Sequence, residues 1–154
     1  MNRFMQTAFN EALRAKEQGE VPVGAAIFKD GELVAAAHNR TEQTKDPTAH
    51  AELLAIRLAL KKLGTKNLAG CALYVTLEPC AMCAGAIHLC KMDRLYFGAY
   101  DTKSGACGGH TDLARSGCFD YKTEIYGGIG ELECEKLLTS FFQSIRKGEN
   151  HGRE

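Results

Sequence analysis

The fold is decided by the stretch CALYVTLEPCAMC at residues 71–83. It begins with a short run of apolar, aromatic and β-branched residues, which is typical of a buried strand. Pro79 then opens a predicted helix that runs to about Cys90, because proline is favoured at the first position of a helix. Cys80 and Cys83 therefore fall in the first turn of that helix, directly after the strand.

A second motif, His50-x-Glu52, lies upstream at the start of another predicted helix. Asp46 offers a cap and Pro47 suits a first helical position, so we expect this helix to begin at or just before His50. Residues two apart on the side of a helix point in different directions. His50 and Glu52 can converge only near the helix start, where side chains lean toward the N-terminus. Two helix N-termini would then point at one metal ion.

A set of three metal ligands indicates a catalytic zinc site. A structural zinc site is normally closed by four protein ligands, whereas a catalytic site keeps three and leaves the fourth position to water. His50, Cys80 and Cys83 are three, so we expect one Zn²⁺ per subunit with a bound water or hydroxide. The positive end of a helix dipole favours the thiolates that zinc needs. Glu52 would take a proton from the water and carry it to a ring nitrogen and a departing amine. The pattern predicts hydrolytic deamination.

Other interpretations of these residues remain open. A Cys-x-x-Cys pair alone also fits a redox pair or half of a structural zinc site. Cys107 or His110 could close the site as a fourth ligand. Cys90 could do so as well, but it lies two turns down the same helix, about 10 Å from a metal at the helix start. We therefore interpret Cys90 as a core residue.

The remaining cysteines and histidines lack a partner pattern. The chain has seven cysteines, an odd number without the spacing of a disulfide framework. Cys71, Cys118 and Cys134 are predicted to be small buried hydrophobic residues, and His38 and His88 to be structural or surface residues.

The rest of the chain alternates strands and helices. We predict a helix at residues 3–18, a β-hairpin of 21–28 and 33–38, helices at about 50–64 and 79–90, strands at 71–76, 94–99 and 123–126, a glycine-rich connection at 100–121, and a helix at 130–146. This order predicts an α/β fold, a three-layer α/β/α sandwich whose mixed five-stranded sheet is covered by helices. Residues 1–147 should form a single domain, with 148–154 as a frayed tail.

Charge and hydropathy narrow the functional classes. Of the 154 residues, 19 are Lys or Arg and 19 are Asp or Glu, so no general basic surface attracts polyanions and any nucleic acid must bind a local patch. No charged-then-apolar leader or membrane-length apolar run is present. We expect a cytoplasmic protein with no membrane partner.

On these motifs the chain resembles the cytidine-deaminase-like superfamily of zinc-dependent nucleobase deaminases, whose signature combines His-x-Glu with Pro-Cys-x-x-Cys. Within it, the chain is most similar to the bacterial tRNA-specific adenosine deaminases, which convert the wobble adenosine of a tRNA anticodon to inosine. The likeness is carried by residues 20–25, 46–52, 73–87, 97–101 and 137–142.

The resemblance implies roles for individual residues. His50, Cys80 and Cys83 would be the zinc ligands and Glu52 the proton shuttle. The positions that match substrate contacts are Asn39, Val23, Ala51, Asp101, Lys103 and Phe142. The partner would be a tRNA anticodon stem-loop, and the active sites would be composite sites of a homodimer.

These substrate contacts differ in chemistry. Asn39 would contact the target nucleoside, because its amide can both donate and accept hydrogen bonds. Asp101 would lie at the sugar, and Val23 and Ala51 would be pocket walls. Lys103 could contact phosphate, as could Arg146 and Lys147, and Phe142 could stack on a base. Packing in the core is an alternative for Phe142.

One segment departs from the family pattern. Residues 118–121 read Cys-Phe-Asp-Tyr where many tRNA-specific members carry an asparagine or histidine pair, and this segment could help shape the substrate groove. Two other functions stay open: a deaminase of a free base or nucleoside such as guanine or cytosine, and a noncatalytic zinc-stabilised RNA-binding module in which Glu52 is idle.

Overall fold

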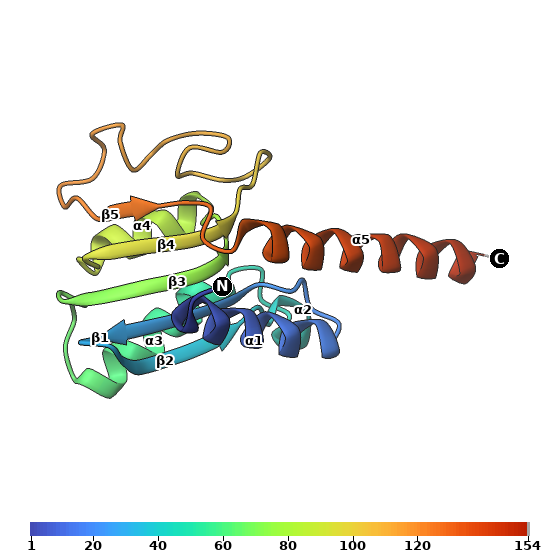
Figure 1. The fold of residues 1–154 in the computed structure, drawn as a ribbon, viewed down its shortest axis with the longest axis horizontal. Coiled ribbons are helices and arrows are strands. Elements are labelled where there is room, and N and C mark those ends of the chain that lie inside the picture. The colour runs from blue at the N-terminus through green and yellow to red at the C-terminus, as the bar shows by residue number, and fades with distance from the viewer. Residues whose placement is uncertain (154) are drawn as a thin grey trace.

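A mixed five-stranded sheet forms the centre of the computed structural model, which describes the backbone of residues 1–153 and the side chains of residues 1–148. The strand order is β2-β1-β3-β4-β5 (Figure 1). β1 pairs antiparallel with both β2 and β3, whereas β3, β4 and β5 are parallel. The strands are β1 (Gly24–Lys29), β2 (Glu32–His38), β3 (Cys71–Leu77), β4 (Arg94–Ala99) and β5 (Glu124–Tyr126).

Helices cover both faces of this sheet. α1 (Arg3–Glu17) packs on β1 and β3, and α3 (Ala51–Leu63) packs on β2 and β1 from the other face, with α4 (Ala81–Leu89) beside it. α5 (Glu131–Arg153) begins against β4 and then projects away from the sheet (Figure 1). The predicted three-layer α/β/α sandwich with a mixed five-stranded sheet is confirmed.

The first hairpin has the turn that its sequence predicts. Asp30 and Gly31 both have positive φ, 51° and 77°, which is the backbone of a two-residue turn that matches strand twist. Within β1, Gly24 is required by close packing, because a Cβ there would lie 2.0 Å from the carbonyl oxygen of Ala8 in α1. α1 can therefore lie directly on the sheet.

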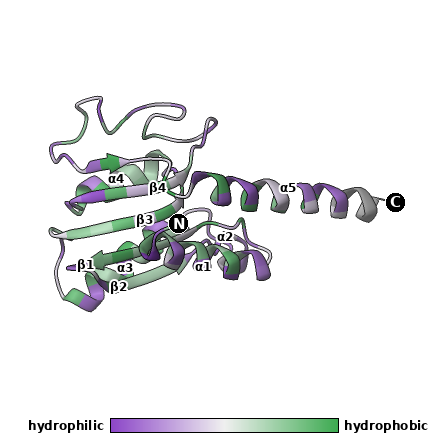
Figure 2. Ribbon diagram, in the orientation of Figure 1, coloured by the Kyte–Doolittle hydropathy of each residue, from purple (hydrophilic) through white to green (hydrophobic). Residues whose placement is uncertain are grey.

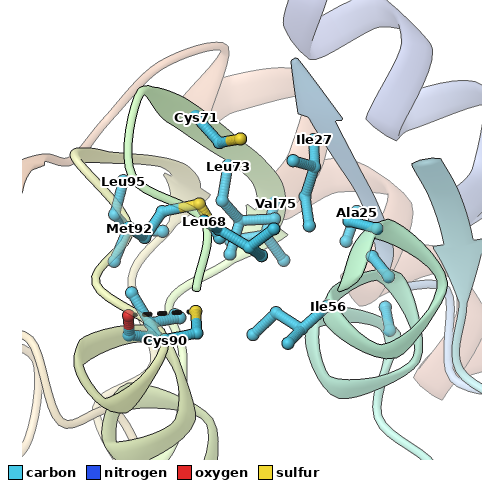
Figure 3. Close-up of a cluster of buried hydrophobic side chains, with 14 of the residues drawn as sticks. Ala25, Ile27, Ile56, Leu68, Cys71, Leu73, Val75, Cys90, Met92 and Leu95 are labelled. Carbon is cyan, nitrogen blue, oxygen red and sulfur yellow. Dashed lines mark hydrogen bonds between the residues drawn. The ribbon is translucent and has the colours of Figure 1, made fainter. Parts of the chain in front are cut away.

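The larger core cluster lies between the sheet and the helices α3 and α4. Alternate strand residues such as Ile27, Leu73 and Leu95 contribute to it, and β1 and β3 are coloured mainly as hydrophobic in Figure 2. Figure 3 shows Cys71 and Cys90 among these side chains, where they are 1% and 5% exposed. Their predicted role as core residues is confirmed.

The other cysteine predictions have mixed outcomes. Cys134 is buried at the start of α5, as predicted, whereas Cys118 is exposed. Cys118 belongs to the long connection between β4 and β5, which is held by its own turns, and its thiol donates to the carbonyl oxygen of Leu113 at 3.4 Å. The prediction of a buried Cys118 was wrong because this connection lies outside the packed core.

Helix boundaries differ from the prediction at several points, and α4 begins at Ala81 with Cys80 as its N-cap where Pro79 was expected to open the helix. α3 begins at Ala51 with His50 as its N-cap, because Asp46 does not cap the helix but accepts hydrogen bonds from the backbone and side chain of Thr48, closing a separate turn. A short helix, α2 (Thr41–Thr44), was not predicted.

α5 also extends beyond its predicted end at residue 146. The helix ends at Arg153, while Glu154 lies outside the described residues. That residues 148–154 fray stays a prediction. A single glycine in a helix interior costs only about 1 kcal/mol, so Gly148 is compatible with this continuation.

Candidate metal centre and adjoining groove

Two helix N-termini meet beyond the carboxyl end of β3. His50 is the N-cap of α3 and Cys80 the N-cap of α4, both with extended backbone dihedrals. Glu52 lies in the first turn of α3, and Cys83 in the first turn of α4. Side chains at such positions point past the helix end. The convergence that the two motifs predict is therefore produced by their places at the two helix starts.

The spacing of the donor atoms fits zinc. Nδ1 of His50 lies 3.6 Å from Sγ of Cys80 and 3.6 Å from Sγ of Cys83, and all three donor atoms lie within 4.8 Å of one another. Zn–N bonds of about 2.0–2.1 Å and Zn–S bonds of about 2.3 Å at a tetrahedral angle place nitrogen and sulfur about 3.6 Å apart. The three side chains are therefore spaced for one tetrahedral zinc ion.

Within the described part of the chain, this metal-binding group contains no fourth ligand. The thiol of Cys90 donates to the carbonyl oxygen of Ile87 at 3.3 Å, and Nδ1 of His110 lies 3.2 Å from the carbonyl oxygen of Thr102. Cys107 is buried, and burial raises its pKa to about 12. The three-ligand arrangement leaves one position of a tetrahedral metal open, as in catalytic sites.

The two thiols shift each other's pKa in opposite directions. The pKa of Cys80 falls to about 4, chiefly because the Cys83 side chain donates a hydrogen bond to it. The same pairing, together with burial, raises the pKa of Cys83 above its usual range. The pKa of His50 is raised, first by its hydrogen bond to Cys80. A lowered thiol pKa favours the thiolate form that zinc binds.

Glu52 lies in the interior beside these ligands, 4% exposed. Burial raises its pKa to about 7, because desolvation disfavours the charged form of a carboxyl. A group that gains and loses a proton near neutral pH is suited to general acid–base work. The geometry and the pKa of Glu52 both fit a proton shuttle.

Asn39 contacts the start of α3. Its side-chain oxygen accepts a hydrogen bond from the backbone N–H of Ala51 at 2.8 Å, which satisfies one of the free donors at a helix N-terminus. The NH₂ group and the second lone pair of the amide oxygen remain for a ligand. The predicted contact of Asn39 with a nucleoside stays a prediction.

The other polar and aromatic residues in our predicted substrate set line one groove. Asp101, Lys103 and Phe142 border a cavity of about 1250 Å³ between α5, the loop after β4 and the end of α1. Arg146 lines it too, and so does Leu77, the last residue of β3. The family resemblance placed these residues in one set, and the structure brings them to one groove. Their contacts with a substrate stay predictions.

Val23 and Ala51 lie in the core cluster, 4% and 0% exposed. Their role as pocket walls stays a prediction.

The segment that departs from the family pattern packs elsewhere. The ring of Phe119 stacks on His88 at a centroid distance of 4.3 Å, and the hydroxyl of Tyr121 donates to Asp93 at 3.2 Å. His88 lies in the last turn of α4, at the opposite end from Cys80. Within this chain the segment therefore contacts the far end of α4 and does not border the groove.

Glu78 is a site residue that sequence reasoning missed. It is buried next to Pro79-Cys80, and its carboxylate accepts hydrogen bonds from backbone N–H groups of the loop after β4. The available signal was an acidic residue between an apolar strand and the Pro-Cys pair, a place where a charge needs buried partners.

Known proteins with similar sequences include zinc-binding deaminases. Residues 1–99 match the family model described as the cytidine and deoxycytidylate deaminase zinc-binding region. The tRNA-specific adenosine deaminase of Bacillus subtilis is 44% identical over 151 residues, covering 98% of this chain and 94% of that protein.

Two solved structures are also similar to this chain. A structure from studies of A-to-I editing by tRNA deaminases at the wobble position of transfer RNA has a TM-score of 0.85 and 43% identity, over 88% of this chain and 98% of the other. A guanine deaminase from Bacillus subtilis has a TM-score of 0.62 and 40% identity, over 66% of this chain and 67% of the other.

Proposed function

We propose, from the premise that this chain belongs to the cytidine and deoxycytidylate deaminase family and, within it, to the tRNA-specific adenosine deaminases, that it hydrolyses adenosine to inosine at the wobble position of a tRNA anticodon loop. The observation that carries the proposal is the His50, Cys80 and Cys83 cluster with the zinc spacing of its donor atoms and the buried carboxylate of Glu52 beside it.

The reaction adds water to C6 of adenine and releases ammonia. Zinc held by the three ligands would supply a Lewis acid that makes a water molecule acidic near neutral pH. Glu52 accepts a proton from the attacking water and delivers it to N1 of the ring. It then takes the second proton of the water, from the new hydroxyl group on C6, and carries it to the amino group, which leaves as ammonia while the ring keeps the oxygen. Such assistance contributes roughly a hundred- to ten-thousandfold in rate.

The chain's other residues would bind the RNA. The NH₂ group of Asn39, fixed by the hydrogen bond from Ala51 to its carbonyl oxygen, can donate to an acceptor on the target nucleoside. Nucleotides that flank the flipped-out base would lie in the groove beside Asp101 and Lys103. A groove open along α5 suits a loop of RNA better than a free base, which favours the tRNA substrate over the guanine or cytosine alternative.

The assembly would be a homodimer with one zinc ion per subunit, formed through α4. This helix, AMCAGAIHL, contains no Asp, Glu, Lys or Arg, yet Leu89 is 85% and Met82 38% exposed on its outer side. Leu58 of the neighbouring α3 is also exposed. A helix that is apolar all round is normally buried, and a second copy of this chain would cover it. Among the described residues no helix is long and apolar enough to cross a bilayer.

The proposed function is tested by incubating zinc-loaded protein with an anticodon stem-loop that carries adenosine at the wobble position. Free adenosine, guanine and cytosine are assayed in parallel, with inosine and ammonia as products. Inosine from the stem-loop alone, lost in Glu52→Gln, supports the proposal. Activity on a free base only would overturn the substrate, and inactivity on every substrate would favour the noncatalytic RNA-binding module.

A further inference from the structure

Glu78 connects the metal-binding turn with the loop that follows β4. It is 2% exposed, and its Oε1 accepts a hydrogen bond from the backbone N–H of Asp101 at 3.0 Å. Its Oε2 accepts from the backbone N–H groups of Cys107 at 2.9 Å and Gly109 at 2.8 Å. Hydrogen bonds of this kind offset the cost of burying a carboxylate. One side chain thereby holds both ends of the 101–109 loop.

The loop is shaped around this carboxylate. A Cβ built on Gly105 would lie 2.3 Å from Oε2 of Glu78, and one built on Gly109 would lie 2.2 Å from Oε1. Side chains at these two positions would therefore collide with the carboxylate. Glycine is needed here for the close approach of backbone to Glu78.

The same loop contacts the metal-binding turn and the groove. The backbone N–H of Ala106 donates to the carbonyl oxygen of Pro79 at 2.9 Å, and Gly105 forms an antiparallel bridge with Cys80. At its other side, Oδ1 of Asp101 accepts from the backbone N–H of Lys103 at 3.0 Å, and both residues line the groove. Glu78 thus lies between a metal ligand and a wall of the groove.

We propose that Glu78 is a positioning residue: its carboxylate fixes Asp101 and the loop that carries Lys103 beside Cys80, so that this loop binds the RNA substrate. The inference rests on the proposed function, because it concerns the same site. Glu78 acts through the loop and does not touch the reacting atoms.

Glu78→Gln is a selective perturbation. A glutamine has one accepting oxygen, which can keep the bonds from Cys107 and Gly109, while its NH₂ group then faces the N–H of Asp101, donor against donor. The contact with Asp101 is lost and the side chain keeps its length. We expect KM for the anticodon stem-loop to rise about tenfold, the order that hydrogen bonds to charged groups contribute, with kcat and zinc content unchanged.

Gly109→Ala perturbs the same contact from the loop side and should raise KM similarly. Gly148→Ala is the matched control, because a Cβ there meets nothing within 4 Å, and it should leave KM unchanged. A double-mutant cycle with Asp101→Ala tests the connection. If Glu78 acts by positioning Asp101 and Lys103, Glu78→Gln raises KM by a smaller factor in the Asp101→Ala background than in the wild-type background.

The outcomes separate the two proposals. A wild-type protein that does not deaminate the stem-loop overturns the proposed function, and the role of Glu78 in RNA binding with it. An active wild type whose KM is unchanged by Glu78→Gln and Gly109→Ala overturns the role of Glu78 alone. A merely structural role would instead lower thermal stability, zinc content and kcat while KM stays constant, and that result would also overturn it.

Discussion

Replacing Glu52 by glutamine should stabilise the metal-free protein while abolishing turnover. Burial raises the pKa of Glu52 from 4.5 to about 7, so the folded state disfavours the ionised side chain. The sign follows from proton linkage: the unfolded chain releases this proton at lower pH than the folded chain does, so stability falls as pH rises through that interval. At pH 7, a pKa difference of this size costs about 3 kcal/mol. A neutral glutamine of the same shape avoids that cost.

The assay is urea unfolding of chelator-treated protein between pH 5 and pH 8. We expect the Glu52→Gln protein to gain about 1 kcal/mol at pH 5 and about 3 kcal/mol at pH 7, with only about 0.3 kcal/mol more at pH 8. Glu17→Gln, which neutralises an exposed carboxylate on α1, is the control and should show no such gain. A gain independent of pH, or a less stable Glu52→Gln protein at pH 7, would refute the argument that burial sets the pKa of Glu52.

The remaining predictions concern the amide, the thiols and the apolar helix face. Asn39→Asp keeps an oxygen for the N–H of Ala51 but loses the NH₂ donor, so kcat/KM should fall about tenfold or more with little loss of thermal stability. Asn39→Ala should lower both kcat/KM and thermal stability. Equal thermal stability of the two variants would contradict the role of the Ala51 hydrogen bond. Zinc binding should release about one proton at pH 8, from Cys83, whose pKa is raised, and more protons at lower pH as His50 becomes protonated. Calorimetry in buffers of different ionisation enthalpy measures the number of protons released. A number that falls as pH is lowered would contradict the assignment of Cys83 and His50 as ligands. Leu89→Lys should dissociate the dimer in sedimentation experiments, and a wild-type protein that sediments as a monomer would count against the assembly.

Much of the fold was predictable because local signals agreed with the global arrangement. The apolar run before Pro79, the turn at Asp30-Gly31 and the periodicity of α1 and α3 each specify one element. The helix boundary at His50 was less predictable, because Asp46 suits both an N-cap and a turn, and its bonds to Thr48 decide between them. Exposure of Cys118 also depended on tertiary packing that its sequence neighbours do not encode.

The cluster of His50, Cys80 and Cys83 was predictable because its spacing follows from helix geometry, whereas the contacts of Glu78 were not. His50 and Cys80 each lie at a helix start, a position that sequence patterns mark. The role of Glu78 depends on Cys107 and Gly109, about thirty residues away, and only the fold brings them together. Long-range hydrogen bonds of this kind leave no periodic signal in a single sequence.

The central claim is hydrolytic deamination of a wobble adenosine, with Glu52 as the proton carrier. The most direct test is mass spectrometry of an anticodon stem-loop incubated with the zinc-loaded protein in water enriched in heavy oxygen, beside the Glu52→Gln protein. The account predicts inosine at the wobble position that carries one solvent oxygen, formed by the wild type and reduced at least about a hundredfold in the variant. Unchanged adenosine with the wild-type protein, or equal conversion by the variant, would contradict it.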